Sequence, residues 1–131
     1  MKKCFFIIMV LSLFTYAQEK VVELSFLLNN SESYHNKVIT IEGYLSEPND
    51  DVIYVFKSRN DSKSFSFEKG VFIDLVGNKS KAKYIKKCKD KYVSFTGRYY
   101  HVNNTSGGVI GHVINVKYYD QANKEFIDCL K

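Results

Sequence analysis

The sequence lacks the residue clusters that usually mark an enzyme or a metal site. Its three cysteines and three histidines are scattered along the chain, with no Cys-x-x-Cys, His-Glu-x-x-His or mixed Cys/His group. Zinc centres and dithiol redox sites need such clusters. Asp74 has no second acid at a spacing that suggests paired catalytic carboxylates, and Ser31 and Ser33 belong to no nucleophile motif. We therefore expect no enzymatic activity, no metal and no cofactor.

A large excess of charge of one sign is also missing. The chain has 19 Lys and Arg residues against 14 Asp and Glu residues, which gives a formal net charge of +5. Dedicated nucleic-acid-binding proteins normally have a much stronger basic excess gathered on one face. Nucleic-acid binding is therefore only the third of the functions considered for this chain.

No apolar stretch is long enough to cross a membrane. The longest one, residues 4–14, is shorter than the roughly 20 residues that span a bilayer. It follows Lys2 and Lys3, and it is followed by small residues flanking Tyr16 and then by a polar segment. This order is typical of a secretory signal peptide.

We accordingly expect residues 1–17 to be a signal peptide that is cut after Ala17. The remaining residues, 18–131, are long enough for one domain with one core. This mature part would be periplasmic or secreted and would contain no transmembrane segment. Loss of Lys2 and Lys3 would lower the formal charge from +5 to +3.

Two cysteines, Cys88 and Cys129, remain after this cleavage. Exported proteins are found where disulfides persist. Strands expected at residues 92–102 and 109–119 should form a hairpin, which brings the chain after the second strand back towards residue 88. We expect a Cys88–Cys129 disulfide; the alternative is a pair of buried free thiols.

Two segments of the chain, residues 37–45 and 91–99, follow the same plan. Each opens with a lysine, continues with alternating apolar residues and then places a glycine, Gly43 or Gly97, on the apolar face. A glycine at an inward position lets a strand bend sharply. Such bends allow a short sheet to close into a small barrel.

Alternation and turn residues predict five strands and two helices. The sole proline, Pro48, opens a predicted turn with Asn49 and Asp50. Residues 59–69 are polar and serine-rich apart from Phe65 and Phe67, and indicate either a long loop or a frayed strand extension. The expected strands are residues 37–45, 52–57, 71–76, 92–102 and 109–119, with a short helix within 22–28, a lysine-coated helix at 79–89 and a turn at 103–108.

Three strands, a helix and two further strands form the pattern of an OB-fold. Residues 23–30, followed by residues 34–45, resemble the opening of many small bacterial OB-fold proteins, and residues 88–111 resemble their last two strands. The resemblance implies an all-β protein with short helices, built as a five-stranded Greek-key barrel. Exported members of this family are generally thought to bind small or cationic ligands, but no binding residue can be carried over.

Aromatic residues provide the candidate binding site. OB-folds that bind polymers use rings on strands two and three as stacking platforms. Alternation places Tyr54 and Phe56 on the same face of strand two. The alternative is that the outward rings merely cover the sheet and pack against the N-terminal helix. The candidate ligand-binding residues are Tyr44, Tyr54, Phe56, Phe72 and Tyr99.

These features favour an exported, non-catalytic binding or interaction module. Its partner would be a small molecule, a component of the cell envelope or an anionic polymer; the lysine-coated helix is either an anion-binding surface or simply a solvated one. The alternative function is a protein-directed inhibitor or immunity-type protein, for which residues 59–69 would supply the contact surface.

Overall fold

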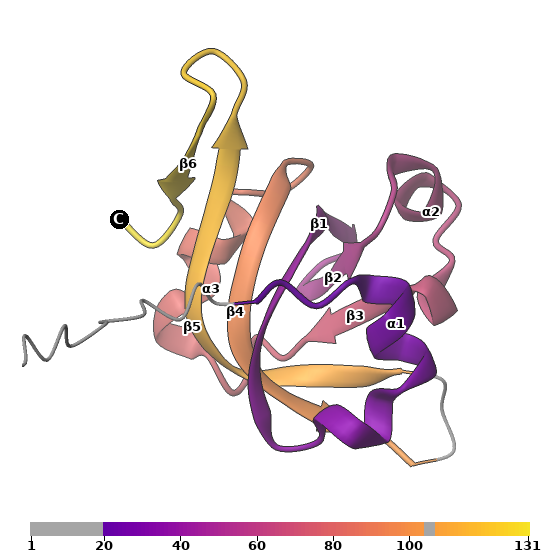
Figure 1. Ribbon diagram of the computed structural model, residues 1–131. Coiled ribbons are helices and arrows are strands. Elements are labelled where there is room, and N and C mark those ends of the chain that lie inside the picture. Colours follow the sequence, from indigo (N-terminus) through magenta and orange to yellow (C-terminus); the bar gives the residue numbers. More distant parts are fainter. Residues whose placement is uncertain (1–19, 104–106) are drawn as a thin grey trace, which may run out of the picture.

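The computed structural model describes residues 20–103 and 107–131. The expected signal peptide and its cleavage site therefore lie outside the described residues, as does the middle of the predicted 103–108 turn. The described chain is mostly antiparallel β-sheet with a few short helices (Figure 1), as expected from the sequence. No described helix is both long enough and apolar enough to span a membrane.

Within this part of the chain there are six strands rather than five. In order, the elements are α1 (Leu24–Asn29), η1 (Ser31–Tyr34), β1 (Lys37–Asn49), β2 (Val52–Phe56), α2 (Arg59–Lys63), η2 (Phe67–Lys69), β3 (Gly70–Ile73), α3 (Lys79–Lys86), β4 (Tyr92–His101), β5 (Gly108–Asp120) and β6 (Glu125–Asp128).

The strands are hydrogen-bonded in the order β3-β2-β1-β4-β5-β6, and each of these neighbours is antiparallel. In addition, β3 runs parallel to β5, with Phe72 opposite Val109 and Ile73 opposite Ile110. The strands β1, β2, β3, β5 and β4 are thus joined in a closed circuit of pairings. β6 lies outside this circuit, along the second half of β5.

The two similar segments pair with each other as the central strands of the sheet. β1 and β4 are antiparallel, and Ile41 lies opposite Phe95, its equivalent in the other segment. As a result, each buried glycine faces a branched apolar residue: Gly43 lies opposite Val93, and Gly97 lies opposite Ile39. The absence of a side chain on one strand leaves room for the side chain on the other.

Gly97 also lies very close to β5, at a point where the β4–β5 register shifts. A Cβ atom on Gly97 would lie 2.5 Å from the carbonyl oxygen of His112 and would overlap the Ile110 side chain. Gly43 is similar, because a Cβ atom there would overlap the carbonyl oxygen of Phe56. Both glycines are therefore required by close approach of a neighbouring strand.

Replacing Gly97 with alanine should lower the free energy of unfolding by about 1–3 kcal/mol, because β5 must move away from β4. Gly107→Ala is the control, since its Cβ atom would make only ordinary contacts with the described residues, the nearest at 3.5 Å from Leu28. Urea unfolding followed by far-UV circular dichroism measures both. Equal stability of the two variants would contradict the packing described for Gly97.

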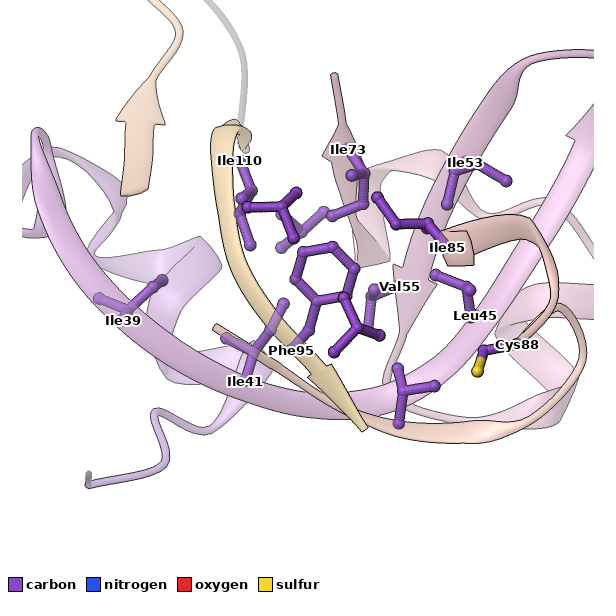
Figure 2. Close-up of a cluster of buried hydrophobic side chains, with 14 of the residues drawn as sticks. Ile39, Ile41, Leu45, Ile53, Val55, Ile73, Ile85, Cys88, Phe95 and Ile110 are labelled. Carbon is purple, nitrogen blue, oxygen red and sulfur yellow. The ribbon is translucent and has the colours of Figure 1, made fainter. Parts of the chain in front are cut away.

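One cluster of buried apolar side chains fills the space inside the circuit (Figure 2). Phe95 lies in the middle of the cluster, near Ile41 and Val55. The helices complete the cluster: α1 contributes Leu24 and Leu27, and α3 contributes Ile85. Burial of these side chains is the main favourable term in folding.

Several boundaries differ from those predicted. β1 continues through Pro48 because this residue lies in a register irregularity between Ser46 and Asn49, where the ladder does not need its missing N–H. The turn instead uses Asp51, with φ 62°. β3 ends at Ile73 rather than Val76, because the next residue, Asp74, turns the chain by accepting a hydrogen bond from Gly77 N–H at 3.0 Å.

Residues 59–69 form neither a loop nor a strand extension. Ser58 caps α2, since its hydroxyl oxygen accepts a hydrogen bond from the Asp61 N–H at 3.1 Å. η2 follows and leads into β3. Serine is a favoured helix N-cap, so the serine-rich composition that suggested a loop also supplies the helix start.

The predicted disulfide between Cys88 and Cys129 is present, with the Cα atoms 6.3 Å apart. Cys88 lies just beyond α3, which ends at Lys86 rather than Lys89, and Cys129 directly follows β6. β6 was not predicted because only Phe126 and Ile127 are apolar in its four residues. Pairing with β5 and the adjacent disulfide hold it in place.

An exposed ion pair links the start of the N-terminal helix to Lys57, the residue after β2. Glu23 caps α1 by accepting a hydrogen bond from Phe26 N–H at 2.9 Å, and its carboxylate lies 2.9 Å from the Lys57 ammonium group. The Lys57 contact lowers the pKa of Glu23 to about 2, and the helix cap adds to this effect. Both partners are more than half exposed, so water screens this pair.

Candidate functional site

Aromatic side chains gather on the outer face of β2 and β3. Tyr54 lies directly opposite Phe72 in the β2–β3 register, and their ring centroids are 5.4 Å apart. Phe67 of η2 lies against the same tyrosine, with the centroids 5.1 Å apart. Strand alternation explains the placement, because Ile53 and Val55 point into the core and Tyr54 between them points outward. We call Tyr54, Phe67 and Phe72 the aromatic face.

Phe56 lies beside this face but is fully buried. Its ring stacks on Tyr54 at 5.6 Å and lies over Gly70 of β3, its partner in the register. Phe56 does not belong to the inner core cluster. Tyr54 and Phe56 therefore share a face, as alternation predicts, but only Tyr54 has an accessible ring.

The aromatic face borders a hollow of about 340 Å³. Its volume is in the range of pockets that hold small molecules. Ring faces can stack on flat ligands. The lining residues are Tyr54, Phe67, Glu68, Gly70, Phe72, Val102, Gly107, Gly108 and Val109, of which Glu68 alone is charged.

Tyr44 lies elsewhere on the surface of the sheet. On the outer side of β1 it packs edge-on against Tyr92, with the ring centroids 5.2 Å apart, and the guanidinium of Arg59 lies 5.3 Å from its ring centre. Burial raises the pKa of Tyr92 to about 12, helped by the nearby Glu42 carboxylate. Tyr44 does not line the hollow.

Tyr99 is fully buried and belongs to the core. Its hydroxyl is 2.6 Å from the Ser31 hydroxyl, which is also 2.8 Å from Nδ1 of His101. Burial raises the pKa of Tyr99. This network fastens η1 to β4 behind Gly108, whose added Cβ atom would overlap the Tyr99 ring. Tyr99 thus supports one wall of the hollow without lining it.

Sequence reasoning did not include Phe67 and Glu68 in the site. The available signal was the pair Phe65 and Phe67 within an otherwise polar segment. The structure places Phe67 on the aromatic face, whereas the Phe65 ring stacks on that of Phe67, with the centroids 6.4 Å apart, and Phe65 is 47% exposed. Phe65 also has φ 51°, a left-handed conformation that is uncommon for a bulky residue.

A larger cavity, of about 680 Å³, lies between α1 and the start of β1. Its walls are mostly apolar and include Val21, Phe26, Tyr34 and Val38. The first described residue, Lys20, forms part of the wall. The hollow beside the aromatic face is lined instead by residues of β2, β3, β5 and η2 together with Val102 and Gly107, and it includes Tyr54 and Phe72, two of the ligand-binding residues expected from the sequence.

Within residues 20–103 and 107–131, no three His, Cys, Asp or Glu side chains come together in a way that could hold a metal ion.

A scan against protein-family models, a search of curated proteins and a search of solved structures each found no match for this chain.

Proposed function

We propose that this protein is an exported, non-catalytic binding module built on an OB-fold. Support for the fold comes from the closed circuit β1-β2-β3-β5-β4 and from the position of α3 between β3 and β4 in the chain. These are the connectivity and helix position of a five-stranded OB-fold barrel. β6 is then an addition on the second half of β5.

The observation that carries the proposed function is the cluster of accessible rings around the hollow. OB-folds bind their ligands on this part of the barrel. The hollow is too small for a polymer to lie within it, and the one charged side chain among its described lining residues is the carboxylate of Glu68. The ligand class that fits best is a small molecule with a flat apolar ring that is neutral or positively charged.

Loss of the Tyr54 or Phe72 ring should weaken binding of a flat ligand by about tenfold, since a stacking ring contributes on the order of 1–3 kcal/mol. The neutral fluorescent probe N-phenyl-1-naphthylamine can be titrated into the mature protein and its Tyr54→Ala and Phe72→Ala variants. Tyr119→Ala is the matched control, because Tyr119 is 37% exposed and does not line this hollow. Phe56→Ala should instead reduce stability. Equal probe affinity in all variants would reject the site.

Export is tested separately by sequencing the N-terminus of the protein recovered outside the cytoplasm. The expected first residue is Gln18, because Thr15 and Ala17 are the small residues that signal peptidase requires. Protein that retains Met1 and stays in the cytoplasm would reject the export proposal while leaving the binding site untouched.

One observation favours the second candidate, a protein-directed inhibitor. Phe65 and Phe67 are 47% and 46% exposed, and Phe65 is held in a left-handed conformation. Residues held in sparsely populated backbone conformations cluster at functional sites. A Phe65→Ser variant separates the two functions. A small-molecule binder should retain its affinity for the naphthylamine probe, whereas an inhibitor should lose its protein target.

A further inference from the structure

A second hollow, independent of the proposed ligand site, lies at the disulfide-linked end of the molecule. It has a volume of about 560 Å³. Lysines from three separate segments line it: Lys87 at the end of α3, Lys91 before β4, and Lys131 after β6. The only acid in its lining is Asp128. We call it the lysine hollow.

The three lysines of the hollow have no acidic partners among the residues described here. Instead, the Lys91 ammonium lies 4.0 Å from the ring centre of Tyr118, and that of Lys87 lies 4.9 Å from that of Tyr84. The neighbouring Lys86 behaves differently, because it forms an ion pair with Asp51. What distinguishes Lys87, Lys91 and Lys131 is therefore that they line one cavity, since they come from separate segments of the chain.

The single acid of the hollow does not neutralise these cations. One oxygen of Asp128 accepts a hydrogen bond from the Leu130 N–H at 2.8 Å. The charged side chains among the described lining residues are thus three lysines and one aspartate, so positive charge predominates. Like charges gathered without counter-ions repel one another, so an anion placed between them would be bound favourably.

The rest of the lining is apolar and indicates what the anion is attached to. Tyr118, Ile127 and the Cys88–Cys129 disulfide form the wall beside the lysines. Ring and aliphatic surfaces of this kind can cover an apolar group. The hollow thus combines positive charge on one side with an apolar surface on the other.

We propose that the lysine hollow binds a phosphate monoester attached to an apolar group. A phosphate monoester carries close to two negative charges at neutral pH, so a group of lysines attracts it more strongly than it attracts an anion with one charge. Lysine ammonium groups bind phosphate as compact point charges.

The disulfide makes this site possible. Cys129 fixes the segment that carries Asp128 and Lys131 against the end of α3, which carries Lys87. Without the bond, β6 would be held only by its pairing with β5. Reduction should therefore weaken phosphate binding even where the fold persists.

Titration calorimetry with phenyl phosphate tests the proposal on the mature, oxidised protein. Lys91→Gln and Lys131→Gln should each weaken binding by about tenfold, the value of one charge-assisted hydrogen bond. Lys79→Gln is the matched control, because it removes the same charge from the first residue of α3, which does not line the hollow. Equal losses in all three variants, or no saturable binding, would overturn the proposal.

Vesicles of phosphatidylcholine with and without phosphatidic acid distinguish a lipid headgroup from a soluble phosphate ester. Binding of phenyl phosphate, or of vesicles that contain phosphatidic acid, supports the site if it is lost with Lys91→Gln and kept with Lys79→Gln. Which of the two ligands is bound identifies the source of the phosphate. Binding of the naphthylamine probe should be unchanged by Lys91→Gln. The two sites can therefore fail independently.

Discussion

Replacing Phe95 with alanine is expected to lower the free energy of unfolding by about 3–5 kcal/mol, the usual cost of removing a buried ring. Phe95 is fully buried at the centre of the core and lies opposite Ile41 in the pairing of the two similar strands (Figure 2). Loss of the ring would leave a cavity between β1, β2 and β4. The strands cannot close this cavity without breaking the hydrogen-bonded pairings that join them in the circuit.

The measurement is urea unfolding by far-UV circular dichroism, because the chain has no tryptophan to report by fluorescence. Phe126→Ala is the control, since Phe126 is 38% exposed on β6; its loss should cost no more than about 1 kcal/mol. If Phe95→Ala does not fold, Phe95→Leu should give a smaller loss that can be measured. A Phe95→Leu variant as stable as the wild type would contradict the central position of this ring.

Removal of the disulfide should cost about 4 kcal/mol in the chain-entropy model, because the bond closes a long loop. The two cysteines are 41 positions apart in the sequence. Both cysteines are buried, but their side chains are small. Replacing them with alanine should therefore add only a small loss of packing energy to the loss of the bond. The loss is a large share of the stability of a small domain.

Thermal unfolding of the Cys88→Ala/Cys129→Ala double variant gives this loss, and treatment with a reductant provides the control. Reductant should lower the midpoint of the wild type and leave that of the double variant unchanged. Two titratable thiols in the denatured, exported wild type would contradict the bond. In the double variant, the increase in amide hydrogen exchange over the wild type should be largest in β6, because Cys129 directly follows this strand.

The candidate site could be predicted only in part. Alternation correctly placed Tyr54 and Phe56 on the same face of β2, and Phe72 on the opposite face of β3 from Val71 and Ile73, because the side-chain period of a strand is a local property. Alternation specifies which face of a strand a side chain lies on, but it does not specify how far that side chain is buried. Phe56 is buried and Tyr54 is accessible because of what covers them, and this depends on where η2 packs.

The sequence alone determined the features that depend on local pattern or on simple arithmetic. The inward glycines Gly43 and Gly97 lie where the repeated pattern places them, and two cysteines in the chain after residue 17 left one possible intramolecular pair. The β-rich class followed in the same way from alternation over several segments.

Only the tertiary structure decided the features that depend on distant partners. The parallel β3–β5 contact, which closes the circuit, joins two residue pairs that are 37 positions apart in the chain, and nothing in either short segment encodes it. β6 exists because β5 is long enough to pair with it and because Cys129 is tethered to Cys88. The lysine hollow arises for the same reason, since its cations come from three segments that meet only after folding.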